Sequence, residues 1–251
     1  MAIAVVVLAV CLVRCVASSR IPEHHYDWTR LQTTGDLKTY TAKDGTAARL
    51  AVDVAYYDGS VDWQALREAG VEIAYVRVGY RGYTQGSIVE DECARANLLG
   101  AISAGLEPGI YFFSQAISEA EAVEEADFAC DYMDAFGLGS MPVCFDMEYN
   151  NVPDERIAGL DTDEKTAIAL AFCDEVVERG YSAIIYGNRY WLDGEYDLKT
   201  IIKRYPLWLA EYNDVPSATF AFVAWQYDDD AVLPGLDFGI DVNLWFAAED
   251  A

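Results

Sequence analysis

Residues 142–149 end in two carboxylic acids whose spacing could serve acid–base chemistry. Apolar residues alternate here with Cys144, Asp146 and Glu148, a pattern typical of a short buried strand. Side chains two residues apart in a strand point to one face, about 6.5–7 Å apart along the chain. Carboxyl groups that close do not ionise independently, so the pKa of one is raised. A protonated carboxyl beside a carboxylate is suited to cleaving glycosidic bonds, although two acids that simply end a strand in solvent would give the same pattern.

The rest of the chain from residue 49 alternates between strand-like and helical patterns. Asp62 and Ser118 are expected to begin helices, and Gly70, Gly105 and Gly180 to follow helix ends. The expected strands are residues 50–54, 73–78, 108–113, 142–149, 183–186, 207–210, 222–227 and 240–243, and the expected helices are 62–69, 91–104, 118–136, 161–179 and 196–203.

Five strand–helix units followed by three strands with little helix predict an α/β fold, a TIM-like barrel with an incomplete helical jacket. An open doubly wound sheet is the alternative. No Gly-x-Gly-x-x-Gly sequence or phosphate-binding loop follows the first strand, which argues against that alternative.

Carboxylates and aromatic residues stand near the ends of most of the expected strands. In parallel barrels the chemistry collects at the carboxyl ends of the strands, so we expect these side chains on one rim together with Asp146 and Glu148. Each aromatic taken alone could belong to the core, and Asp53 alone could be a cap. The candidate substrate-binding residues are Asp53, Tyr111, Phe113, Tyr186, Trp208, Trp225, Tyr227 and Asp241.

The charge balance excludes several classes of partner. Lys and Arg number 17 against 42 Asp and Glu, which gives a net charge of −25. Nucleic-acid binding needs clustered basic residues, so we expect no nucleic-acid partner, and adsorption to anionic membranes is disfavoured for the same reason. An acidic chain with 13% aromatic residues is compatible with a neutral polymer such as carbohydrate. We expect a monomer without a cofactor.

The cysteines and histidines do not form a metal-binding pattern. Cys93, Cys130, Cys144 and Cys173 lie at long, irregular spacings, without a Cys-x-x-Cys, and the only two histidines are adjacent to each other. We therefore expect no metal site. Buried free thiols are the default interpretation of these four cysteines, with one disulfide as the alternative in an exported protein.

The first 17 residues differ in character from the rest. Residues 2–13 form an apolar run whose length suits a signal peptide better than a membrane span. We interpret residues 1–17 as a signal peptide or retained N-terminal anchor, residues 18–48 as a polar linker or N-terminal extension, and residues 49–251 as the barrel domain. The expected location is outside the cell or at the cell envelope, with membrane contact only if the N-terminal segment is retained.

Seven segments, in order, resemble the lysozymes of glycoside hydrolase family 25, the N,O-diacetylmuramidases. The resemblance extends from about residue 50 to residue 246. It departs from the family pattern modestly: Ala55 stands where Ser is usual, and Asp58 where Gln or Asn is common. The matching segments are residues 53–63, 91–106, 109–114, 145–148, 207–213, 225–227 and 239–243.

This resemblance implies a (β/α)5(β)3 barrel that hydrolyses the β-1,4 bond between N-acetylmuramic acid and N-acetylglucosamine in peptidoglycan. The family's catalytic acid falls on Glu148 and its partner carboxylate on Asp146. Two further rim acids fall on Asp53 and Asp241, and the sugar-side tyrosine falls on Tyr186. Two alternatives remain open: a catalytically silent barrel that only binds peptidoglycan or another glycan, and a glycosidase acting on another N-acetylated amino-sugar polymer.

Overall fold

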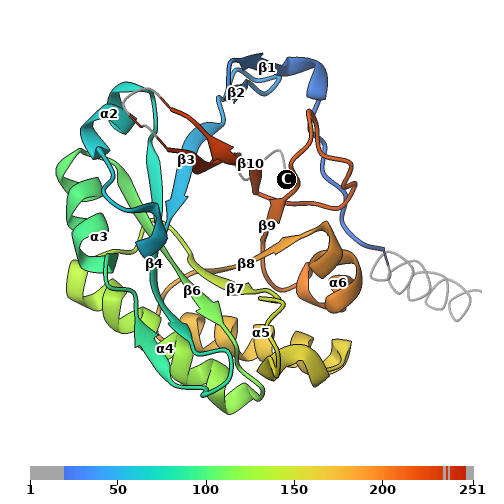
Figure 1. Cartoon of the computed structure of the whole chain (residues 1–251). Coiled ribbons are helices and arrows are strands. Elements are labelled where there is room, and N and C mark those ends of the chain that lie inside the picture. The colour runs from blue at the N-terminus through green and yellow to red at the C-terminus, as the bar shows by residue number, and fades with distance from the viewer. Residues whose placement is uncertain (1–19, 234–235, 237, 247–251) are drawn as a thin grey trace, which may run out of the picture.

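Eight strands close into a mixed barrel in the computed structural model, which describes residues 20–233, 236 and 238–246 (Figure 1). The order around the barrel is β3, β4, β6, β7, β8, β9, β10 and β11, and β11 pairs back to β3. Neighbouring barrel strands are parallel except at β11, which is antiparallel to both of its neighbours. The strands are β3 (Arg49–Val54), β4 (Ile73–Arg81), β6 (Glu107–Ser114), β7 (Val143–Met147), β8 (Ala183–Asn188), β9 (Leu207–Ala210), β10 (Ala224–Ala231) and β11 (Ile240–Trp245).

Helices cover only part of this barrel, which confirms the prediction of an irregular TIM-like fold. Three of them begin where the sequence predicts: the side chains of Asp62, Ser118 and Asp161 each accept a backbone N–H in the first turn of a helix. After β8 only short helical segments follow. The helices are α2 (Trp63–Glu68), α3 (Ala94–Ser103), α4 (Glu119–Phe136), α5 (Thr162–Glu178) and α6 (Leu198–Ile201), with shorter turns η2 (Tyr56–Asp58), η3 (Arg156–Gly159) and η4 (Trp191–Glu195).

An N-terminal extension packs on the barrel where helices are missing. It contains η1 (Trp28–Arg30) and a hairpin of β1 (Leu31–Thr34) and β2 (Leu37–Tyr40), which lies above β10 in Figure 1. Tyr26 is buried, and its Oη donates a hydrogen bond to the carbonyl of Phe222 at 2.6 Å. The ring of Trp28 lies edge-on against Trp225. Residues 20–48, which the sequence leaves as a linker or an extension, thus form an extension packed against the barrel.

The two faces of each barrel strand bury different sets of side chains. In β7, Val143, Phe145 and Met147 face outward into the core shared with the helices. The inward-facing positions form a second, smaller cluster that includes Tyr75 and Trp208. Gly109 makes room for this inner cluster, because a Cβ at that position would lie 2.6 Å from the ring of Tyr75.

The structure adds a few short strands and leaves other expectations outside its range. β5 (Ile88–Glu90) pairs antiparallel with β4 beyond the barrel, and the sequence did not predict it or the β1–β2 hairpin. The signal peptide or anchor expected at residues 1–17 lies outside the described residues. Among the residues that are described, none of the helices combines the length and apolar composition needed to cross a bilayer. Cys93, Cys130, Cys144 and Cys173 are all free thiols.

Candidate active site

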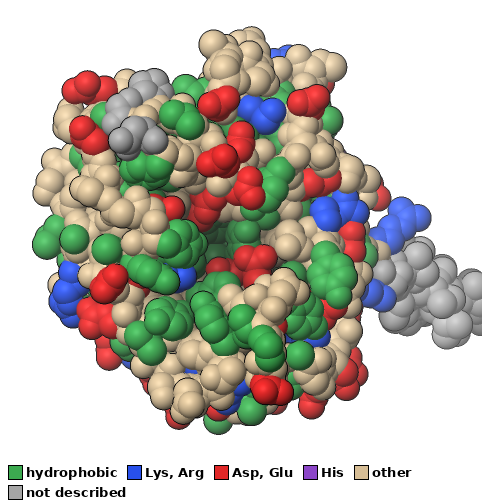
Figure 2. All heavy atoms as spheres, viewed as in Figure 1, with side chains coloured by type: hydrophobic (Ala, Val, Ile, Leu, Met, Phe, Trp, Pro, Cys, Tyr) green, Lys and Arg blue, Asp and Glu red, His purple; other side chains and the backbone are tan. Residues whose placement is uncertain are grey.

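A cleft of about 490 Å³ opens at the end of the barrel where the parallel strands finish. Figure 2 shows it as a hollow in the face toward the viewer, with acidic side chains gathered around it. Eight of the ten predicted site residues line this cleft: Asp53, Tyr111, Phe113, Asp146, Glu148, Tyr186, Trp208 and Asp241. The structure therefore brings together residues separated by up to 188 positions in the chain, the distance from Asp53 to Asp241.

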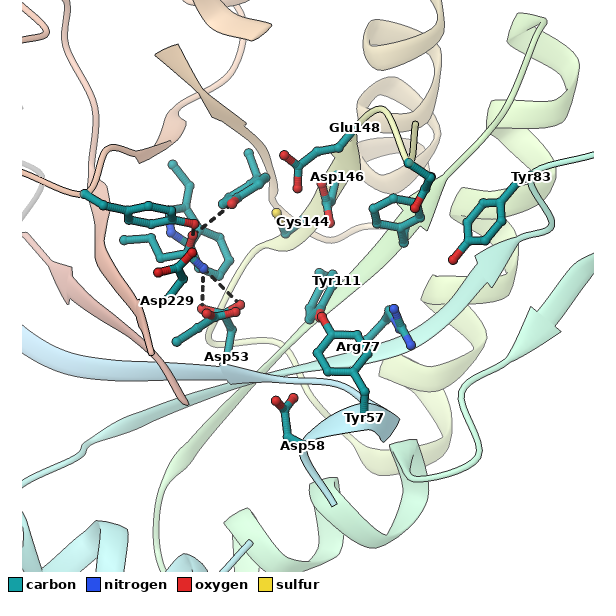
Figure 3. A pocket seen from close by; sticks show the side chains of 17 residues that line it. Asp53, Tyr57, Asp58, Arg77, Tyr83, Tyr111, Cys144, Asp146, Glu148 and Asp229 are labelled. Atoms are coloured by element: carbon teal, nitrogen blue, oxygen red, sulfur yellow. Dashed lines mark hydrogen bonds between the residues drawn. The ribbon is translucent and has the colours of Figure 1, made fainter. Parts of the chain in front are cut away.

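Asp146 and Glu148 project side by side from the end of β7 (Figure 3). Asp146 is buried, and its Oδ1 has no hydrogen-bond partner among the described residues, whereas Glu148 is half-buried and accepts from Asn188 Nδ2 at 3.3 Å. Gln115 Nε2 donates to the backbone carbonyl of Glu148 at 2.9 Å, which fixes the end of the strand.

Burial raises the pKa of both carboxyl groups. The pKa of Glu148 rises to about 7 because it loses solvent and faces the charge of Asp53. Burial is also the main reason that the pKa of Asp146 is raised well above its ordinary value, with a further contribution from the charge of Glu148. The pair therefore holds at least one proton at neutral pH.

Asp53 and Asp241 form a second carboxyl pair on the wall of the cleft. They are direct cross-strand partners, because β11 runs antiparallel to β3 and its first residues lie beside the last residues of β3. Gln226 Nε2 donates to both oxygens of Asp53, at 3.2 and 3.0 Å, and Asn243 Nδ2 donates to Oδ2 at 2.7 Å. Burial and the charge of Asp53 raise the pKa of Asp241 to about 10. Burial raises the pKa of Asp53 as well, while the hydrogen bonds from Asn243, Gln226 and Asp241 act in the opposite direction, so of the two carboxyls Asp53 is the one whose ionised form is supported by donors.

Aromatic residues fix the geometry of this wall. Tyr186 Oη and Tyr212 Oη both donate to Gln226 Oε1 at 2.8 Å, which orients the amide toward Asp53. Trp208 Nε1 donates to Asn243 Oδ1 at 2.8 Å and orients the second amide in the same way. The tyrosines and Trp208 thus hold the donors that support the Asp53 charge, while their rings face the cleft.

Two of the predicted site residues lie elsewhere, which corrects the sequence interpretation. Trp225 and Tyr227 are buried on the outer face of β10, where they contact the N-terminal extension instead of the cleft. Gln226, between them in the strand, points inward and lines the cleft. The sequence does not separate the two faces of β10, because both are buried and the outer one is covered by residues far away in the chain.

The cleft is also lined by residues that the sequence pattern did not indicate. Arg77 in β4 is the single basic residue among the described side chains of the lining; it is buried and pairs with Asp91 through Nε at 2.9 Å. Its positive charge lowers the pKa of Asp146 against the stronger effect of burial. An arginine inside the apolar strand 73–78 was a signal for such a role, since charged residues are seldom buried without a partner. The other unselected lining residues are Tyr57, Asp58, Tyr83, Cys144, Asn150, Tyr212, Gln226 and Asp229.

The chemistry available in this cleft is acid–base chemistry on a polar substrate. It combines raised carboxyl pKa values with aromatic faces that suit sugar rings. Within the described part of the chain, no group of three or more His, Cys, Asp or Glu side chains is arranged to hold a metal ion.

Comparison with known proteins adds to this geometry. Residues 52–236 match the family model described as glycosyl hydrolases family 25. The autolytic lysozyme of Clostridium acetobutylicum is 25% identical over 194 residues, which make up 76% of this chain and 54% of that protein.

Solved structures share the fold. The modular autolysin LytC of Streptococcus pneumoniae, solved in complex with synthetic peptidoglycan ligand, has a TM-score of 0.69 at 22% identity, over 90% of this chain and 52% of that one. A lysozyme from Streptomyces coelicolor has a TM-score of 0.62 at 23% identity, over 82% of this chain and 96% of that one. This chain thus spans about half the length of the Clostridium lysozyme and of LytC.

Proposed function

Because the chain belongs to glycosyl hydrolases family 25, we propose that it is a muramidase, hydrolysing the β-1,4 bond between N-acetylmuramic acid and N-acetylglucosamine in bacterial peptidoglycan. The observation that carries this proposal is the Asp146–Glu148 pair, with raised pKa values, in an acidic and aromatic cleft. The peptidoglycan ligand of LytC supports the choice of substrate. An apolar N-terminal segment of the kind that directs export fits a substrate outside the cytoplasm.

Glu148 is the general acid in this proposal and protonates the leaving oxygen. A pKa of about 7 keeps a large fraction of Glu148 protonated at neutral pH, and its half-buried position leaves the carboxyl accessible from the cleft. Asn188, which donates to Glu148 Oε2, limits the orientations that the carboxyl can adopt.

Asp146 stabilises the positive charge that develops at the anomeric carbon. Burial and the charge of Glu148 raise its pKa, the positive charge of Arg77 acts in the opposite direction, and the unpartnered Oδ1 is free to accept a hydrogen bond from substrate. Two routes fit this role: direct stabilisation or attack by the carboxylate, and orientation of the substrate's own acetamido group as the nucleophile. Both routes use Glu148 as the general acid and Asp146 as its partner carboxyl.

Asp53 and Asp241 position the substrate and set the electrostatic potential around Glu148. Burial and the charge of Asp53 raise the pKa of Asp241, and the amide donors favour the ionised form of Asp53, so the negative charge of this pair is centred on Asp53. This charge raises the pKa of Glu148, so the pair helps to keep the general acid protonated.

The test is release of reducing sugars from purified peptidoglycan by the wild type and by Glu148→Gln, with mass analysis of the products. We expect disaccharide-peptides with muramic acid at the reducing end from the wild type, and a rate about 10²–10⁴-fold lower from the variant. Digestion of chitin in parallel distinguishes a glycosidase for another amino-sugar polymer. A wild type that sediments with the wall but releases no reducing ends would refute the muramidase proposal in favour of a binding barrel.

A further inference from the structure

A second hollow, of about 520 Å³, lies beside the cleft. The N-terminal hairpin forms one side of it, and the loop after β9 and part of strand β10 form the other. We call it the hairpin groove. Tyr212, half-exposed, lines both the cleft and the hairpin groove, so the two hollows share a wall. The residues that line the hairpin groove are Thr33, Gly35, Asp36, Lys38, Tyr212, Asn213, Asp214, Tyr227 and Asp228.

The hairpin side of this groove is held in place by contacts to the barrel. The backbone N–H of Lys38 donates to Tyr227 Oη at 3.2 Å, and the N–H of Val232 donates to Asp36 Oδ2 at 3.3 Å. Gly35 occupies the first position of the two-residue turn with φ +61°, a conformation that favours glycine. These hydrogen bonds fix the position of the hairpin relative to the barrel and so define the shape of the groove.

Lys38 places a buried positive charge at this groove. The residue is only 9% exposed, and its ammonium lies 5.8 and 5.6 Å from the ring centroids of Trp225 and Tyr227. Within the described residues its Nζ has no hydrogen-bond acceptor and no carboxylate at ion-pair distance. Aromatic faces stabilise the charge but accept no conventional hydrogen bond, so the three N–H donors are left to solvent or to a ligand in the groove. An oxygen atom of a ligand in the groove would supply an acceptor.

The acidic residues of the hairpin groove favour a positively charged group on the ligand. Asp36, Asp214 and Asp228 outnumber the single lysine, and Asp214 is exposed on the loop after β9. Such a groove favours a ligand that carries both an ammonium and an acceptor oxygen, which is the chemistry of a peptide with a free amino group. The hairpin precedes residue 52, where the match to the family model begins.

We propose that the hairpin groove binds a short peptide with a free amino group, attached to the glycan whose sugars occupy the cleft. The ammonium of the peptide faces Asp214 and Asp228, and a carbonyl or carboxylate oxygen accepts from Lys38. The half-exposed ring of Tyr212 lies between the sugar and the peptide. This inference rests on the proposed function, because it takes the glycan in the cleft as given.

Binding to the Glu148→Gln protein tests the groove without cleavage. Solubilised peptidoglycan fragments are used in three forms: untreated, with amines acetylated, and stripped of peptides by an amidase. Dissociation constants are measured by interferometry on the immobilised protein. We expect untreated fragments to bind about threefold to tenfold more tightly than the other two forms, the scale of one or two polar contacts.

Two variants and a control assign the effect to the groove. Asp214→Asn changes an exposed side chain, and Lys38→Met removes the ammonium but keeps the packing over the rings; each should abolish the preference for untreated fragments. Asp163→Asn, an exposed aspartate at the start of α5, should retain it. Equal affinity for the three forms, or an equal loss on all three in both variants, overturns the proposal. Failure of wild-type cleavage is a separate result that refutes the muramidase function and not the peptide site.

Discussion

Replacing Glu148 by glutamine should stabilise the folded protein at alkaline pH while it removes the proposed general acid. Burial raises the pKa of this carboxyl from 4.5 to about 7. A carboxyl whose pKa is raised by folding favours the folded state when protonated. Its contribution is therefore fully present below pH 4.5 and is lost as the pH rises through about 7. At 1.36 kcal/mol per pKa unit, the difference between 4.5 and about 7 corresponds to a cost of about 3 kcal/mol at pH 8. Glutamine cannot ionise, so the variant avoids this cost.

The measurement is the free energy of unfolding in urea at pH 4, 6 and 8 for the wild type and Glu148→Gln. The stability gain of the variant should be near zero at pH 4 and should reach on the order of 2–3 kcal/mol at pH 8. Glu92→Gln, at an exposed glutamate before α3, is the matched control and should stay within about 0.5 kcal/mol of the wild type throughout.

The dependence on pH is what decides the outcome. A gain of the same size at pH 4 and pH 8 would mean that better packing, and not removal of a buried charge, stabilises the variant. A variant less stable than the wild type at pH 8 would refute the electrostatic reasoning about the cleft altogether.

Three further outcomes follow from the structure. The rate of glycan hydrolysis should fall about tenfold per pH unit above the pKa of Glu148, about 7, and a rate that still rises at pH 9 would contradict its role as the acid. Arg77→Met should lower the free energy of unfolding by about 3 kcal/mol, because it leaves the buried Asp91 carboxylate without its ion-pair partner; urea unfolding checks this. Tyr26→Phe should cost about 1 kcal/mol by leaving the buried carbonyl of Phe222 without its donor, and an unchanged melting temperature would argue against a stabilising role for the extension.

The main catalytic candidates could be predicted because their relation is local. Asp146 and Glu148 lie two residues apart in a strand, and the period of a strand alone places them on one face. Helix starts at Asp62 and Ser118 were predictable for a similar reason, since a capping side chain bonds to a backbone N–H within the next turn. The short strands β1, β2 and β5 gave no such local signal.

The second carboxyl pair depended on strand direction. Asp241 stands at the start of β11 and would lie at the wrong end of a wholly parallel barrel. The antiparallel course of β11 brings it beside Asp53 at the cleft. Both residues could be predicted from the family resemblance and from their positions in the expected strands. The direction of β11, however, is set by its pairing with β3, which is distant in the chain.

By itself, the sequence determined the strand–helix order, the acidic character and the presence of a carboxyl pair on one strand, because these follow from local periodicity and composition. Tertiary structure decided which face of β10 meets the cleft, since the N-terminal extension buries Trp225 and Tyr227 and turns Gln226 inward. It also placed Arg77 among the acids and set the hairpin beside the cleft. These features depend on contacts between segments far apart in the chain, and such contacts cannot be predicted from the local spacing of residues along the sequence.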